Sequence, residues 1–151
     1  MKKILMSFLA VTMLLPVLAQ AADKSFAQFA TALRGYDAVA YQTESKAVQG
    51  NGNHAIHHDG LTYLFSSKKN AKTFKKNPEQ YVPAYNGYCA FGVSKGKKFS
   101  TDPEAFKVVD GKLYMNLNKK VQKLWLKDVP GNITSADEQW TDIEATHPDE
   151  L

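Results

Sequence analysis

The sequence predicts an α+β fold, in which a small antiparallel sheet of hairpins packs with several short helices in a single domain. Asp59-Gly60 and Asp110-Gly111 each separate two short, partly apolar runs, which is the pattern of a two-residue hairpin turn. Residues that cap helices, such as Ser67 and Asn118, precede lysine-rich runs with apolar side chains at helical spacing. Because the strands pair as hairpins between helices, we expect this fold rather than a doubly wound parallel sheet.

The first 21 residues have the pattern of a secretory signal peptide. Lys2-Lys3 precede an apolar run over 4–18, and Ala19-Gln20-Ala21 forms a small-x-small cleavage site. Cleavage after Ala21 would leave 130 of the 151 residues, enough for one domain with a core. We therefore expect a periplasmic or secreted bacterial protein with no stable membrane insertion after cleavage; an uncleaved N-terminal anchor is the alternative.

The charge of the chain argues against a nucleic-acid partner. The formal net charge is +4, and loss of Lys2 and Lys3 with the signal peptide lowers it to +2. A value this small is not typical of nucleic-acid binding. Lysines cluster at 68–76, at 95–98 and at 119–127. Such clusters are usually solvated helix faces, and contact with an anionic surface is the alternative.

Two stretches ahead of the first hairpin have patterns that predict secondary structure. Residues 25–33 carry apolar side chains at helical spacing, which predicts an amphipathic helix that Ser25 caps and Gly35 ends. Residues 38–41 are small and apolar apart from Tyr41, which predicts a buried strand. No internal repeat is evident along the chain.

The first hairpin and its following helices can be specified further. The predicted strand pairs are His58 with Leu61, Ile56 with Tyr63, and His54 with Phe65. Ser67 is expected to cap a helix that continues to Lys76, and Pro78 is expected to open a second short helix.

The second hairpin is expected to pair Val108 with Leu113 and Lys107 with Tyr114. Asn118 then caps a helix, which Pro130-Gly131 ends. A last helix is expected near 135–140. The domain therefore covers 22–143, followed by a frayed tail over 144–151.

Several segments together resemble the YHS domain family. The resemblance begins at 35–41, continues through 58–67, and includes Phe74, Pro78 and Tyr81. Residues 85–90 and 110–114 extend it to the exported single-domain branch of that family. The resemblance covers nearly the whole mature chain, and it implies a small α+β fold of a kind found beside metal-handling proteins, including copper transporters.

The resemblance also implies where metal ligands would be expected. Cysteine-bearing relatives place one cysteine directly after the strand phenylalanine and a second in the following helix. The matching positions in this chain are Ser66 and Asn70. A hydroxyl and an amide are poor substitutes for two thiolates toward copper or zinc.

The candidate metal ligands are therefore Cys89, His54 and His58. Cys89 is the single cysteine, so it forms no intramolecular disulfide; it is either a buried thiol, a link between chains or a soft-metal ligand, with Met115 as a possible partner. Imidazoles suit copper, zinc and nickel. His54 and His58 lie about 13 Å apart along an extended strand, too far to share one ion, although either could join distant residues.

A second kind of candidate is a ligand pocket lined with phenols. The residues concerned are Tyr36, Asp37, Tyr41, Tyr63 and Tyr88. The alternative is a core and rim of amphipathic aromatic residues, with Asp37 as a capping residue.

Together these observations favour an exported YHS-like protein that binds a metal ion, copper first, or a small ligand. The alternatives are a structural or protein-interaction module without a bound ligand, and a thiol-dependent redox protein centred on Cys89. No phosphate-binding loop, recognisable catalytic triad or paired-cysteine site is present in the sequence. The sequence therefore names no reaction and favours binding over catalysis.

Overall fold

A computed structural model describes residues 31–151, and these residues form six α-helices and two antiparallel two-stranded sheets. The α+β class is therefore confirmed, with two separate hairpins rather than one sheet. The predicted signal peptide and most of the helix predicted over 25–33 lie outside the described residues. No helix within residues 31–151 is long and apolar enough to cross a membrane.

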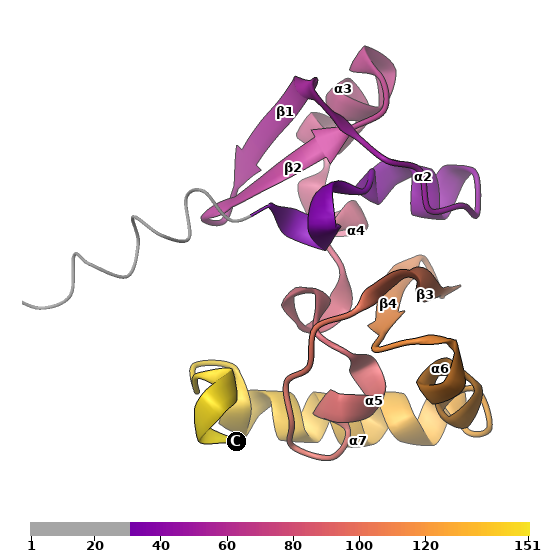
Figure 1. Ribbon diagram of the computed structural model, residues 1–151, viewed down its shortest axis with the longest axis vertical. Coiled ribbons are helices and arrows are strands. Elements are labelled where there is room, and N and C mark those ends of the chain that lie inside the picture. Colours follow the sequence, from indigo (N-terminus) through magenta and orange to yellow (C-terminus); the bar gives the residue numbers. More distant parts are fainter. Residues whose placement is uncertain (1–30) are drawn as a thin grey trace, which may run out of the picture.

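One order of elements occurs twice, although the sequence shows no evident internal repeat. Each copy has a 3₁₀ turn, a short helix, a hairpin and a capped helix, and the copies occupy opposite ends of the molecule (Figure 1). The first comprises η1 (Ala32–Gly35), α2 (Ala38–Thr43), β1 (Asn51–His58), β2 (Leu61–Phe65) and α3 (Lys68–Lys76). The second comprises η2 (Ala84–Gly87), α5 (Ala90–Val93), β3 (Asp102–Val109), β4 (Lys112–Asn116) and α6 (Lys119–Trp125). Helix α4 (Pro78–Tyr81) connects the copies, and α7 (Val129–Ile143) and η3 (Pro148–Glu150) follow the second.

The strand predicted over 38–41 is wrong, because these residues form helix α2. All four are buried, as the apolar run indicated. The carboxylate of Asp37 accepts hydrogen bonds from the backbone N–H groups of Val39 and Ala40, which caps the helix. Burial and apolar character alone do not distinguish a short buried helix from a buried strand.

Both hairpins have the predicted turns. Asp59-Gly60 and Asp110-Gly111 adopt positive φ values of 45° and 74°, and of 49° and 76°, as a type I′ turn requires. The confirmed pairs are His58 with Leu61, Ile56 with Tyr63, Val108 with Leu113, and Lys107 with Tyr114. The pairing of His54 with Phe65 is wrong: a register shift between Asn51 and Ala55 puts Asn51 opposite Phe65.

Most of the predicted helix starts are confirmed. Ser67 and Asn118 cap α3 and α6 as predicted, and Pro78 opens α4. Pro130-Gly131 does not end a helix but lies in the first turn of α7, where proline is tolerated and Asp128 provides the cap.

Strand β4 joins the two halves through its alternating side chains. Leu113 and Met115 belong to the apolar cluster of the N-terminal half, which also contains Phe65 and Phe74. Tyr114, which points the other way, belongs to the second cluster with Trp125. The two cores therefore lie on opposite faces of one strand.

The segment after α7 is attached by Lys98. Its ammonium donates to the backbone oxygens of Glu144 and Thr146 at 2.8 and 2.7 Å and lies over the rings of Tyr88 and Trp140. Burial lowers the pKa of this lysine, and the carboxylate of Glu144 partly opposes that effect.

We predict that Gly50→Ala destabilises the fold by about 1–3 kcal/mol. A Cβ at this position would lie 2.5 Å from the backbone carbonyl carbon and oxygen of Leu64, which cannot yield as a side chain could. Gly52→Ala is the matched control, since nothing lies within 4 Å of its Cβ position. Urea denaturation should show a loss for the first variant and no loss for the second; equal effects would contradict this packing.

We also predict a steep loss of stability above about pH 10. Burial raises the pKa of Tyr63 to about 12 and raises those of Tyr41, Tyr85 and Tyr114 above the ordinary value of 10.0. Raised phenol pKa values stabilise the folded state fully below the unfolded pKa, and this contribution is lost as the pH passes through the folded values. Urea denaturation measured across this pH range should show a shallower fall of the unfolding free energy for Tyr41→Phe. The difference in slope should correspond to about one proton fewer released on unfolding. An unchanged slope would contradict the assignment.

Candidate metal centre

The candidate site begins at the end of the first hairpin. His58 is the last residue of β1 and lies beside the Asp59-Gly60 turn. Its ring packs edge-on against Phe74 at 5.7 Å and lies 6.3 Å from the ring of Tyr63. One side of the imidazole is thus held by the core, and 20% of the side chain is exposed.

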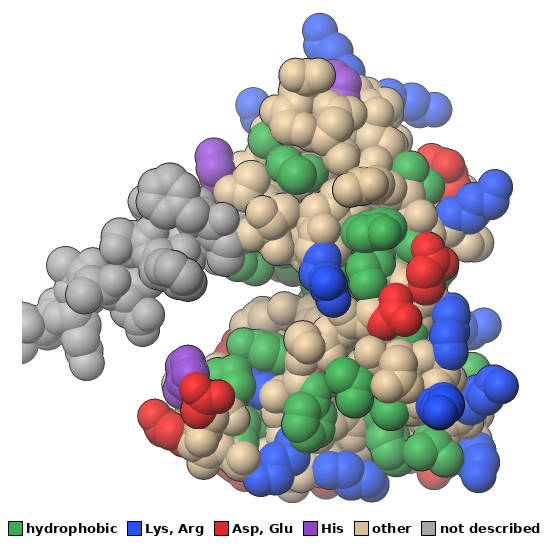
Figure 2. Space-filling model, viewed as in Figure 1, with side chains coloured by type: hydrophobic (Ala, Val, Ile, Leu, Met, Phe, Trp, Pro, Cys, Tyr) green, Lys and Arg blue, Asp and Glu red, His purple; other side chains and the backbone are tan. Residues whose placement is uncertain are grey.

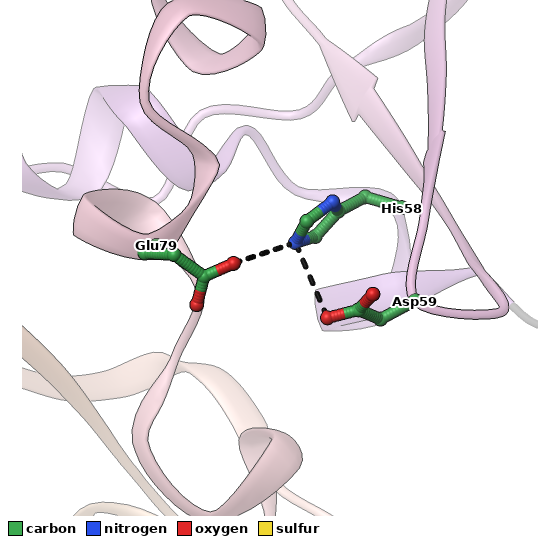
Figure 3. Close-up of side chains that lie close together, drawn as sticks. All are labelled: His58, Asp59 and Glu79. Atoms are coloured by element: carbon green, nitrogen blue, oxygen red, sulfur yellow. Dashed lines mark hydrogen bonds and ion pairs between the residues drawn. The ribbon is translucent and has the colours of Figure 1, made fainter.

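Two carboxylates converge on the exposed nitrogen of this imidazole (Figure 3). Nε2 of His58 lies 3.2 Å from Oε1 of Glu79 and 3.4 Å from Oδ2 of Asp59. Asp59 comes from the hairpin turn, and Glu79 from the first turn of α4. The three ligand atoms all lie within 4.8 Å of one another. Both carboxylate side chains are largely exposed, so the site opens to solvent.

One imidazole nitrogen and two carboxylate oxygens form a ligand set whose chemistry suits a divalent transition metal. Mixed nitrogen and oxygen ligands suit copper(II), nickel(II) and zinc(II), and three protein ligands leave positions for water. Two negative charges would offset the charge of the ion. The same geometry also supports an ion pair when His58 is protonated.

The charges of the site affect the pKa of the neighbouring core phenol, that of Tyr63. Tyr63 is 2% exposed and stacks on Phe74 at 4.7 Å. Burial raises the pKa of Tyr63 to about 12, and the charges of Asp59 and Glu79 add to that increase. The phenol therefore stays protonated at neutral pH.

The other predicted histidine is not part of this group. His54 lies half-buried near the start of β1, beside Asn53 and the lysines of α3. Within residues 31–151, the grouped metal-ligand side chains are those of His58, Asp59 and Glu79. Neighbouring His57 is exposed and shares a hydrogen bond of 2.9 Å with Thr62 Oγ1.

Cys89 is buried away from the histidines. It is 1% exposed, and its Sγ accepts a hydrogen bond of 3.4 Å from the N–H of Gly92, which caps α5. Its other polar neighbour is Asn116 Oδ1 at 3.9 Å. The suspected soft partner, Met115, does lie alongside, since a parallel β-bridge joins Cys89 and Met115. The structure thus gives the thiol a capping role inside the fold.

Asp37 forms the most fully bonded polar group of the N-terminal half. It is 0% exposed. Its Oδ1 accepts from the N–H groups of Val39 and Ala40 at 2.9 and 3.2 Å. Its Oδ2 accepts from the N–H and Oγ of Ser66 and from Nδ2 of Asn70, at 2.8, 2.7 and 2.8 Å. The two positions that the family resemblance marks for cysteines therefore serve as donors to this carboxylate.

The five residues expected to line a ligand pocket lie in different surroundings within residues 31–151. Asp37, Tyr41 and Tyr63 are buried, and the Tyr41 hydroxyl donates to Pro103 O at 3.0 Å. Tyr36 lines a hollow of about 370 Å³ with Arg34 and with residues 100–103. Tyr88 lies in the other half, beneath the Lys98 ammonium and 6.3 Å from the ring of Trp140.

No sequence pattern marks two of the three grouped residues, Asp59 and Glu79, as ligands. Asp59 adjoins His58 but was assigned only to the turn. Glu79 lies 21 residues from His58, and it is the only acidic residue between Asp59 and Asp102. An isolated acid in a lysine-rich stretch was the available signal, but only the fold shows that it faces His58.

Comparison with protein-family models finds no match, and neither does comparison with curated proteins or with solved structures.

We predict that Asp37→Asn destabilises the protein by about 3 kcal/mol or more. In the asparagine variant, an NH2 group replaces one carboxylate oxygen and faces hydrogen-bond donors that the oxygen had accepted from. These buried donors are then left without an acceptor. Cys89→Ala changes the corresponding capping residue of the second half and should cost no more than about 2 kcal/mol. Chemical denaturation of both variants measures the difference. Comparable losses would contradict the special role of the Asp37 carboxylate.

Proposed function

We propose that this protein is an exported, YHS-like metal-binding protein whose ion is held by His58, Asp59 and Glu79. The observation that carries the proposal is the convergence of one imidazole nitrogen and two carboxylate oxygens within 4.8 Å. The hairpin turn and α4 supply these groups, and Phe74 orients the imidazole. Binding rather than catalysis is proposed, since the site supplies ligands without an evident nucleophile beside them.

Copper(II) is the ion we propose first. Among divalent first-row metals, copper(II) generally binds nitrogen and oxygen ligands most tightly. Copper(I) would prefer a thiolate, but Cys89 is buried and its sulfur already accepts a hydrogen bond from Gly92. The proposed copper chemistry is therefore that of the oxidised ion, bound at the surface of the N-terminal half.

The proposed compartment and family rest on the sequence. The signal-peptide pattern of residues 1–21 supports export to the periplasm or beyond. The ordered set of motifs supports the YHS resemblance, and the observed α+β fold is consistent with it. Metal handling is a role that this resemblance implies.

The test is a copper(II) titration of the processed chain, from Ala22 onward, with binding measured by calorimetry and by electron paramagnetic resonance. We predict one ion per chain with a nitrogen ligand, and at least about tenfold weaker binding in His58→Ala and in Glu79→Gln.

Two matched controls separate this site from adventitious binding. His57→Ala removes the neighbouring imidazole, and His147→Ala removes another histidine close to a carboxylate, that of Asp149 at 3.6 Å. Both variants should keep the affinity of the parent protein. If His58→Ala binds copper as well as the parent, or if the parent binds none, the proposed site is wrong.

A second candidate is a protein-interaction module without a bound ligand. The observation that favours it is that the same three side chains can satisfy one another as an ion pair. In that case the protein takes up no metal, and Glu79→Gln lowers stability slightly instead. A redox role for Cys89 would require the buried thiol to react rapidly with an alkylating reagent in the folded state.

A further inference from the structure

Helix α3 presents five lysines to solvent without any compensating acid. Lys68, Lys69, Lys72, Lys75 and Lys76 are all exposed. Within residues 31–151, none of their ammonium groups has an ion pair or a hydrogen bond to another residue. In Figure 2, lysine side chains project from the end of the molecule where α3 lies. The apolar side of the helix packs inward through Phe74 and Ala71.

This arrangement opposes the stability of the helix. Lys68 and Lys69 lie in the first turn, where the helix dipole disfavours positive charge. Lys72 has like-charged neighbours at helical contact spacing on both sides, namely Lys68 and Lys76. Lys75 and Lys76 lie in the last turn, where the helix dipole favours positive charge. Helix energetics do not account for the other three lysines, and an anionic partner would offset the repulsion among them.

The lysines also border two hollows. One has a volume of about 370 Å³ and lies between β1 and α3, with Lys68, Lys72 and Lys75 along it. Its other lining residues are Asn53, His54, Ala55, Ile56 and Ala71. The second, of about 520 Å³, is lined by Thr73 and the lysines at 68, 69, 72 and 76. The first hollow thus combines ammonium groups with apolar side chains.

We propose that this lysine face, defined as α3 with the hollow beside β1, docks on the surface of a bilayer that contains anionic phospholipids. The hollow suits an amphipathic anion, since a lipid phosphate can lie among the ammonium groups while the adjoining glycerol region contacts Ala55 and Ile56. Lysine ammonium groups suit a diffuse field of many headgroups, because they lack the planar fork that arginine offers to a single phosphate.

The docking is peripheral and reversible. The apolar side of α3 is already buried against the core, so the helix has no free apolar face to insert. Attraction therefore comes from charge and should be screened by salt. This docking is independent of the proposed metal site, because none of the lysines belongs to the group around His58.

The test is co-sedimentation of the processed chain with vesicles of phosphatidylglycerol and phosphatidylcholine, compared with phosphatidylcholine alone. We expect binding to the anionic vesicles only, lost on raising the salt from about 0.1 M to about 0.5 M. The triple variant K68Q/K72Q/K75Q should bind the anionic vesicles at least about tenfold more weakly than the parent protein. It should fold and melt at or above the temperature of the parent protein, since it relieves repulsion.

The matched control is K120Q/K123Q/K127Q, which removes the same charge from α6 and the residues after it. These three lysines are also exposed. The control should bind anionic vesicles like the parent protein. Equal weakening of both triple variants, or no vesicle binding by the parent, would overturn the proposal. Binding of soluble glycerol phosphate that depends on α3, without vesicle binding, would overturn it in favour of a small phosphorylated ligand.

Discussion

The buried carboxylate of Asp37 holds together the parts of the N-terminal half on which the rest of the structure depends. It links the start of α2, the residue after β2 and the first turn of α3 through five hydrogen bonds. A carboxylate removed from water requires this many donors, since each unpaired oxygen would cost free energy. The position of α3 relative to the hairpin follows from it.

The position of α3 determines which side chains lie at the surface as well as how the core packs. Because α3 is fixed against the hairpin, Phe74 supports His58, and the chain that leaves α3 brings Glu79 back to the same imidazole. The outer side of α3 then exposes its lysines beside β1. A carboxylate-lined site and a lysine face thus lie on one half of the molecule, both dependent on a group that neither uses directly.

The duplicated arrangement shows how the two halves differ. In the second half, Cys89 takes the capping position that Asp37 has in the first, and its sulfur accepts from Gly92 where the carboxylate accepts from Val39 and Ala40. A thiol needs no comparable set of donors, so the second half contains no equivalent of the Ser66 and Asn70 contacts. Sequence identity between the copies is confined to short pieces such as Gly-Tyr and Asp-Gly, and for this reason the repetition was not evident beforehand.

The sequence alone determined the features that depend on local chemistry. The Asp-Gly turns, the caps at Ser67 and Asn118, and most of the hairpin register follow from backbone preferences of a few residues. His58 was also identified as a candidate ligand. Tertiary structure decided what depends on long-range packing: that residues 38–41 form a helix, that a bulge displaces His54, and that Cys89 is enclosed. It also decided that Glu79 meets His58 across 21 residues, because the path of the chain between them is set by Asp37 and the core, which no local pattern encodes.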